Sequence, residues 1–370
     1  MKRIIIFSIL LFCFCLPVKA ESVYEEQYSS TDIHSIYNAL SNEAKDILDD
    51  FDIDLSDSEW YSKITVSSVF ERLFDIFKGS LKEPMRNCAI VMASLLLCAG
   101  IATFADKDSV LCVSSDMLSV MGVVGVLIVP VCSLIGSIQA ALKGSSVFML
   151  SFIPVFCGLI LLSGGTTVAT VSSGMLISMA EVVGSAVSFV ISPAVSAYIA
   201  LGISASLTPI DYAKNTADTL KKCVVWGMST AAASFSAVLS FQTAFSSATD
   251  RLSLKAARLL TSSVVPVVGG ALSESLSTVA ASFSLLKTSV GLIGVVGIVA
   301  VFLPVVIELL CYKAAVFAMC TVSGILSLSK TTDLLNVISA ALNLMLAAIL
   351  VISILFIVSL AVLLKAGGAV

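Results

Sequence analysis

The sequence predicts an all-α, polytopic integral membrane protein with about 7–9 transmembrane or re-entrant helices, each of roughly 20 residues. Three observations support this class. Hydrophobic residues make up 58% of the 370 residues, charged residues make up only 12%, and the mean hydropathy is +1.05. Soluble domains carry roughly 25% charged residues. The net charge is −4 and most acidic residues lie near the N-terminus, so we expect no nucleic acid partner.

Residues 1–20 have the pattern of a cleavable signal peptide. Lys2 and Arg3 form a basic start, residues 4–16 form a short apolar core, and small residues stand at positions 18 and 20. An uncleaved first transmembrane helix is the alternative. Cleavage would leave the mature N-terminus on the extracytoplasmic side of the membrane.

Residues 21–60 form an acidic segment, which we expect to be extracytoplasmic with one short helix near residues 35–48. The stretch FDIDLSDSEW at 51–60 faintly resembles a calcium loop. It lacks the glycine and the closing glutamate that such loops require, so we expect no metal site there. His34 is the only histidine of the chain, which argues against a histidine-based metal site or catalytic triad.

Residues 61–87 read as an amphipathic juxtamembrane helix. Phe74 and Phe77 lie on its apolar face, and charged residues lie on the opposite face. We expect the helix to end near Pro84 and Arg86. It could lie on the membrane surface or pack against a partner helix, and the sequence does not separate these alternatives.

Residues 88–370 form the predicted multi-span membrane domain. We expect short turns at Lys143–Gly144 and between 310 and 314, and a helix interruption near Pro193. Of the ten cysteines, eight lie in or beside apolar runs and none form a CxxC pair, so neither a disulfide framework nor a zinc site is expected.

The stretch 241–275 departs most from the apolar pattern. Four charged residues fall within three helical turns, and a proline and paired glycines then predict a broken helix. An interfacial helix joined to a kinked span would explain this pattern, as would a re-entrant element lining a wet pathway. The candidate pathway or packing positions are Glu181, Asp250, Arg251, Lys255, Arg258, Pro266, Gly269, Gly270 and Glu274.

The side of the membrane on which residues 250–258 lie stays open. The two most basic loops, at 214–222 and 251–258, lie on opposite sides if residues 223–245 cross the membrane once. Both loops can be cytoplasmic if that segment forms a hairpin.

Acidic residues inside apolar runs are candidates for proton relay or cation binding. Glu181, Glu274 and Glu308 are in this position, although each would be unremarkable at a helix end near the headgroups. The chain has no GxxxxGK[ST] nucleotide-binding loop and no GxSxG or HExxH motif in a suitable context. We therefore expect no catalytic residues, no cofactor and no enzymatic activity.

Four sequence strings together resemble the stage III sporulation protein AE family, and the likeness extends over most of the chain from Tyr61 onward. The strings are FIPVFCGLILLSGG at 152–165, SFQTAFSSATDRLSLKAAR at 240–258, VVPVVGGALSES at 264–275 and LKTSVGLIGVVGI at 286–298.

The resemblance implies a protein of the mother-cell membrane that surrounds the forespore. It would be the polytopic subunit of a channel or secretion-like complex, whose partners include a separate ATPase. The resemblance supplies no catalytic residues. The alternative is an autonomous transporter that couples ions through Glu181 or Glu274.

Overall fold

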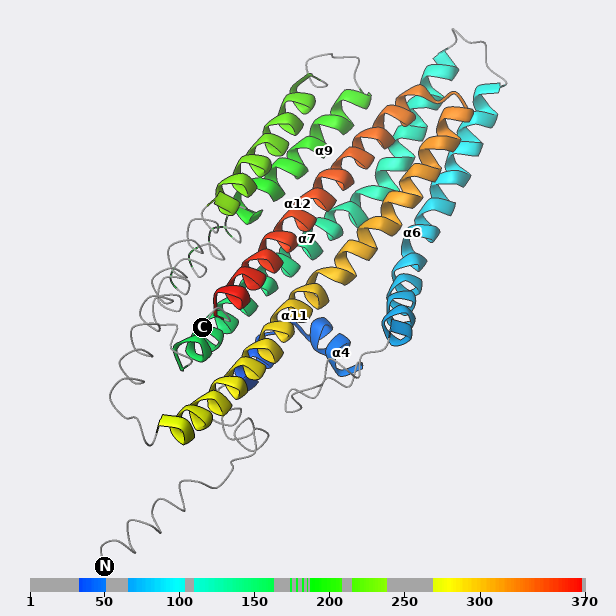
Figure 1. The fold of residues 1–370 in the computed structure, drawn as a ribbon. Coiled ribbons are helices and arrows are strands. Elements are labelled where there is room, and N and C mark those ends of the chain that lie inside the picture. Colours follow the sequence, from blue (N-terminus) through cyan, green and yellow to red (C-terminus); the bar gives the residue numbers. More distant parts are fainter. Residues whose placement is uncertain are drawn as a thin grey trace, which may run out of the picture.

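The computed structural model describes residues 33–50, 66–103, 110–162, 174, 178, 182, 185, 187–207, 215–237 and 269–367. Every regular element among them is a helix, which confirms the all-α class for this part of the chain (Figure 1). The elements are α3 (Ile33–Asn38), α4 (Asn42–Asp50), α6 (Val66–Thr103), α7 (Val110–Leu162), the π-helix η1 (Val187–Ile191), α9 (Ser192–Leu207), a helix over 215–237, α11 (Gly269–Ile325) and α12 (Ser329–Gly367).

Contacts between the long helices fix their directions. α6 and α7 are antiparallel, because Ser94 lies beside Gly122 and Cys98 lies beside Ser115. α7 and α11 are antiparallel (Phe148 with Gly297, Phe152 with Gly294), and so are α11 and α12 (Cys320 with Asn336, Gly294 with Leu360). α6 runs parallel to α11, because Asn87 lies beside Tyr312 and Cys88 lies beside Ala315. The hairpins α6–α7 and α11–α12 therefore point the same way.

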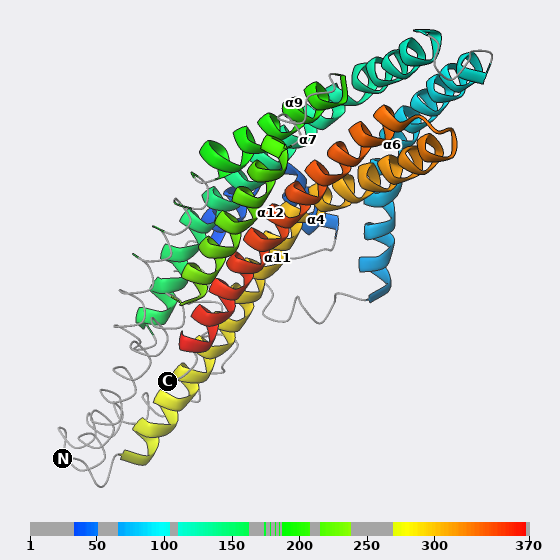
Figure 2. The same cartoon turned by 90° about the horizontal axis from the view of Figure 1, so that it is seen from above.

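A third hairpin points in that direction too. Gly202 of α9 lies against Val337, and Ser192 at the other end of α9 lies against Gln139, so α9 runs toward the same end of the bundle. The helix over 215–237 returns beside α9 in both views (Figures 1 and 2). The paired ends of these three pairs of helices thus lie toward the same end of the bundle.

The bundle is described below as two halves, the tip half and the strap half. The tip half comprises residues 88–103 of α6, 110–132 of α7, 313–325 of α11 and 329–343 of α12. The strap half comprises residues 66–87, 133–162, 269–312 and 344–367 of the same helices, together with α3 and α4, which we call the strap.

The strap is a pair of short helices rather than the single helix predicted near 35–48. The Ser41 hydroxyl accepts a hydrogen bond from the backbone N–H of Ala44, which caps the start of α4 and separates it from α3. The Tyr37 hydroxyl donates to the Asp49 carboxylate at 2.6 Å, and this bond raises the pKa of Tyr37 above its usual range. The apolar face contacts α7 and α11 through Ile36, Leu40, Ala44, Ile47 and Leu48.

The core of the strap half is an aromatic ladder on α7. Phe148, Phe152 and Phe156 are fully buried, and neighbouring ring centroids lie 5.8 Å and 5.4 Å apart. The rings fit against Gly294 and Gly297 of α11, where an added Cβ would come within 2.5 Å of Phe152 and 2.7 Å of Phe148. Glycine is therefore required at these two positions for α7 and α11 to approach this closely.

The turn predicted at Lys143–Gly144 is wrong, because α7 is one helix of 53 residues across this point. A single glycine is tolerated inside a helix at a cost of about 1 kcal/mol. The Ser145 and Ser146 hydroxyls both bond to the carbonyl of Leu142, so they satisfy their polar groups without leaving the helix.

Two other predicted helix ends are also wrong. α6 continues through Pro84 and Arg86 to Thr103, because Asn87 and Cys88 pack against α11 and hold the chain in register. α11 continues between 310 and 314, because buried Cys311 and Tyr312 extend its contact face. A proline inside a helix removes one backbone hydrogen bond and bends the helix without necessarily ending it.

The sequence predicts a helix interruption near Pro193, but the chain stays helical there and the irregularity is the π-helical turn Val187–Ile191. This turn ends two residues before Pro193, which has no N–H to donate to the carbonyl four residues earlier. The Gln139 side chain of α7 donates to the Ser192 hydroxyl at 2.6 Å beside this turn.

Candidate functional site: a polar belt across the bundle

Most of the sequence-predicted positions lie outside the described residues. These are Glu181, Asp250, Arg251, Lys255, Arg258 and Pro266. Gly269 and Gly270 are the first two residues of α11, so the chain is already helical there, and Glu274 follows on the same helix. Their roles stay predictions.

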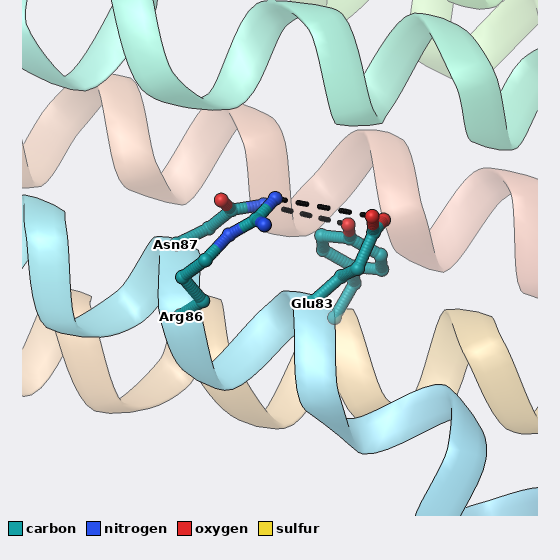
Figure 3. Close-up of polar contacts among 4 residues, drawn as sticks. Glu83, Arg86 and Asn87 are labelled. Atoms are coloured by element: carbon teal, nitrogen blue, oxygen red, sulfur yellow. Dashed lines mark hydrogen bonds and ion pairs between the residues drawn. The ribbon is translucent and has the colours of Figure 1, made fainter.

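The polar cluster that the structure does bring together is at the contact of α6 with α11. The Asn87 amide donates to the Tyr312 hydroxyl at 3.5 Å, and both side chains are buried. One turn away, Arg86 and Glu83 form an exposed ion pair at 3.8 Å (Figure 3). With Glu308 and Lys313 of α11 these residues form what we call the belt. It marks the boundary between the tip half and the strap half.

The belt is an electrostatically mixed layer in an otherwise apolar body. Glu83, Glu308 and Arg86 lie close enough to Tyr312 to act on its hydroxyl electrostatically. Exposed ion pairs such as Glu83–Arg86 contribute about 0–1 kcal/mol. The belt is therefore suited to holding α6 and α11 in register and to facing water or lipid headgroups. Its residues do not form the nucleophile and base of a catalytic site.

A second polar layer lies at the hairpin tips, and we call it the tip layer. Ser119 of α7 and Thr331 of α12 share a hydrogen bond of 2.8 Å and are fully buried. Ser323 and Thr332 share another of 2.8 Å across the α11–α12 turn. Asp116 and Lys330 interact electrostatically at the same level. Paired hydroxyls of this kind join helices where no water is present.

Sequence reasoning singled out Glu308 but not its surroundings. Asn87 and Tyr312 are 225 positions apart, and no local pattern signals that they meet. In the described part of the chain, no three His, Cys, Asp or Glu side chains are placed to hold a metal ion.

The helices and the belt define a class of protein. Five described helices are long and apolar enough to cross a membrane, as in a multi-pass membrane protein. Comparison with known families narrows the class: the family described as Stage III sporulation protein AE matches residues 55–367. This chain belongs to the stage III sporulation protein AE family.

A relative in Bacillus subtilis (strain 168), named Stage III sporulation protein AE, is 25% identical over 232 residues. That region covers 62% of this chain and 57% of the relative, so the chain matches little more than half of the relative's length. No solved structure matches the chain. The strap, at 33–50, lies outside the region matched by the family.

Proposed function

We propose that this chain is a membrane-embedded subunit of a channel or secretion-like complex that connects the mother cell and the forespore and is required for forespore development. The observation that carries this proposal is the family match over residues 55–367. The long apolar helices support a multi-pass position in the membrane. The names of the family and of the relative refer to a stage of sporulation and to no reaction, which supports a non-enzymatic role.

The location we propose is the mother-cell membrane around the forespore, with the N-terminus extracytoplasmic after signal cleavage. The partners are the other subunits of the complex, among them a separate ATPase, and the lipid bilayer. Large exposed apolar side chains on several helices support protein or lipid neighbours on most sides of the bundle.

The test is deletion of the gene in its own host, followed by microscopy of sporulating cells and capture of the tagged, complementing chain. We expect cells to complete engulfment and then stop, the tagged chain to surround the forespore, and an ATPase to co-purify with it. Normal spore yield in the deletion strain would overturn the proposal.

The same strain separates the complex subunit from an autonomous ion-coupled transporter. A subunit that acts through packing should still support spore formation with Glu181→Gln or Glu274→Gln. Loss of spores in these variants while the complex still assembles would favour the transporter.

A further inference from the structure

The packing face of α6 extends further along the sequence than the part of it that is buried. Steps of seven residues, which return to nearly the same face of a helix, lead from Phe77 to Pro84, Val91 and Cys98, and from Phe74 to Leu81, Cys88 and Leu95. From Pro84 onward every member of these two series is buried. Phe77 and Phe74, which precede Pro84, are 43% and 65% exposed. α6 thus carries two large apolar rings on its packing face that remain exposed.

α6 departs from α11 at Pro84. Asn87 and Cys88 hold the two helices side by side at Tyr312 and Ala315. Before Pro84, α6 turns away from α11 in both views (Figures 1 and 2). The proline has no N–H to bond the carbonyl four residues earlier, which is a common cause of a bend in a helix. The bend explains why the packing face is buried after Pro84 and exposed before it.

The strap occupies the place on α11 that a straight α6 would reach. Asn87 and Tyr312 are 225 positions apart, and with this offset Arg72 would lie level with Gly297 of α11. Leu40 of the strap lies beside Gly297 instead. α4 contacts α11 and stands between it and the departing part of α6 in both views (Figures 1 and 2). The strap and the N-terminal part of α6 therefore exclude each other from this surface.

Polar contacts hold the strap together, and apolar contacts hold it to the bundle. The Tyr37 hydroxyl bonds to Asp49, and the Lys45 ammonium donates to the backbone carbonyl of Asn38 at 3.2 Å, so α3 and α4 are tied to each other. The face toward α7 and α11 is aliphatic. Residues 51–65 join the strap to α6, and a chain of this length reaches as far as about 50 Å. The strap can thus leave α11 as one body while it stays attached to α6.

We propose that the strap and residues 66–82 of α6 are alternative occupants of the same surface of α11. While the strap is docked, α6 is bent at Pro84, and Phe74 and Phe77 are exposed. When the strap leaves, α6 straightens at Pro84 and packs Phe74 and Phe77 against α11, at the level of residues 299–302. The strap is therefore an internal inhibitor of this closure.

The two occupants present the same kind of face to α11. Asp75 and Lys82 lie on the side of α6 away from its packing face, Asp46 and Asp49 lie on the side of α4 away from the bundle, and all four are exposed. Exchange of the occupants therefore buries no charge, which would be costly. The family match over residues 55–367 includes all of α6 and leaves out the strap. The closed arrangement thus uses only the part of the chain that the family shares, and the strap controls it.

The first test measures the distance between α6 and α11 with and without a docked strap. Full-length protein with its ten cysteines replaced by alanine carries spin labels at Lys78→Cys on α6 and Val299→Cys on α11, both in detergent micelles. Leu40→Asp with Ile47→Asp places charges on the buried face of the strap and releases it, which faster cutting of the strap by protease verifies. We expect release to shift the distance between the labels to shorter values, as the two helices approach the separation of packed helices, about 8–10 Å between axes.

A second label pair controls for the integrity of the bundle. Leu97→Cys on α6 and Phe317→Cys on α11 lie beyond Pro84, and both replaced side chains are exposed. Their distance should not change on release of the strap. An unchanged or longer distance between Lys78→Cys and Val299→Cys, in a protein whose control pair is unchanged, would overturn the proposal.

A reciprocal test leaves the strap itself unaltered. Two occupants of one surface oppose each other to the same extent in both directions. Phe77→Ser weakens only the arrangement in which α6 is packed on α11, so protease should cut the strap more slowly than in the parent, by up to about tenfold for the loss of one phenylalanine contact. Lys78→Ser, the neighbouring change on the charged side, should leave the rate unchanged. Equal or faster cutting in Phe77→Ser would show that α6 does not compete with the strap.

Discussion

The tip half and the strap half share the same four helices but hold them together by different means. In the tip half, small hydroxyl residues pair in buried hydrogen bonds, as between Ser119 and Thr331. In the strap half, large aromatic rings fill spaces left by glycines, as between Phe152 and Gly294. Rings packed against glycine gain dispersion and, in water, hydrophobic energy, whereas paired hydroxyls are most useful where no water competes. The two halves therefore hold the same helices together through different kinds of contact.

The largest effect should come from the aromatic ladder. Phe152→Ala removes a fully buried ring, and we expect it to lower the free energy of unfolding by about 3–5 kcal/mol. Phe74→Ala removes an equally large ring that is 65% exposed on α6 and should cost less than about 0.5 kcal/mol. Denaturant unfolding in detergent micelles measures both, and equal losses would contradict the role of the ladder.

A smaller loss should follow from filling the glycine contact. In Gly294→Ala the new methyl group meets Phe152, so we expect a loss of about 1–3 kcal/mol from overpacking. Gly125→Ala is the matched control, because no atom lies within 4 Å of its added Cβ and alanine favours the helix. Unfolding midpoints should therefore fall for Gly294→Ala and hold or rise for Gly125→Ala. A rise in both would show that the α7–α11 contact has room to spare.

The hydrogen bond between Ser119 and Thr331 in the tip half should contribute less to the free energy of unfolding. Ser119→Ala and Thr331→Val each break the shared hydrogen bond, and we expect a loss of about 0.5–1.5 kcal/mol from either change. The double variant should lose less than the sum of the two, because neither partner is left unpaired. A double-mutant cycle on the same unfolding curves gives the coupling free energy between Ser119 and Thr331. Strictly additive losses in the two single variants would contradict the prediction.

The smallest effect concerns the strap at high pH. Folding raises the pKa of Tyr37, so the protonated phenol stabilises the docked strap. This contribution is complete below the ordinary tyrosine pKa of about 10 and is lost as the pH rises through the raised value. Limited proteolysis should therefore cut the strap faster at about pH 11 than at about pH 9. Lys45 lies over the same ring, so Tyr37→Phe, which keeps both Lys45 and an aromatic ring, is the control. An unchanged pH dependence in Tyr37→Phe would exclude the tyrosine as the cause.

The sequence predicted the class of fold more accurately than the positions at which the helices end. Composition and apolar run length are properties of single segments, so the helical, membrane-type architecture followed from them directly. The ends predicted at Lys143–Gly144 and near Pro84 were wrong, because contacts with distant helices outweigh the weak local preference for a break. The number of crossings stays a prediction, since several apolar runs lie outside the described residues.

The candidate site could likewise be predicted only in part from the sequence. Glu308 could be singled out from sequence because an acid in an apolar run is conspicuous by itself. The pairing of Asn87 with Tyr312 could not, because it depends on the parallel register of α6 and α11.

The continuity of α11 has a mechanical consequence. One helix of 57 residues, about 85 Å long, joins the seat of the strap at Gly297 to the hairpin turn beside Ser323. Pro304 lies between these points and removes one backbone hydrogen bond, so α11 bends most easily there. A force applied at the strap would be transmitted along α11, and the helix would bend mainly at Pro304.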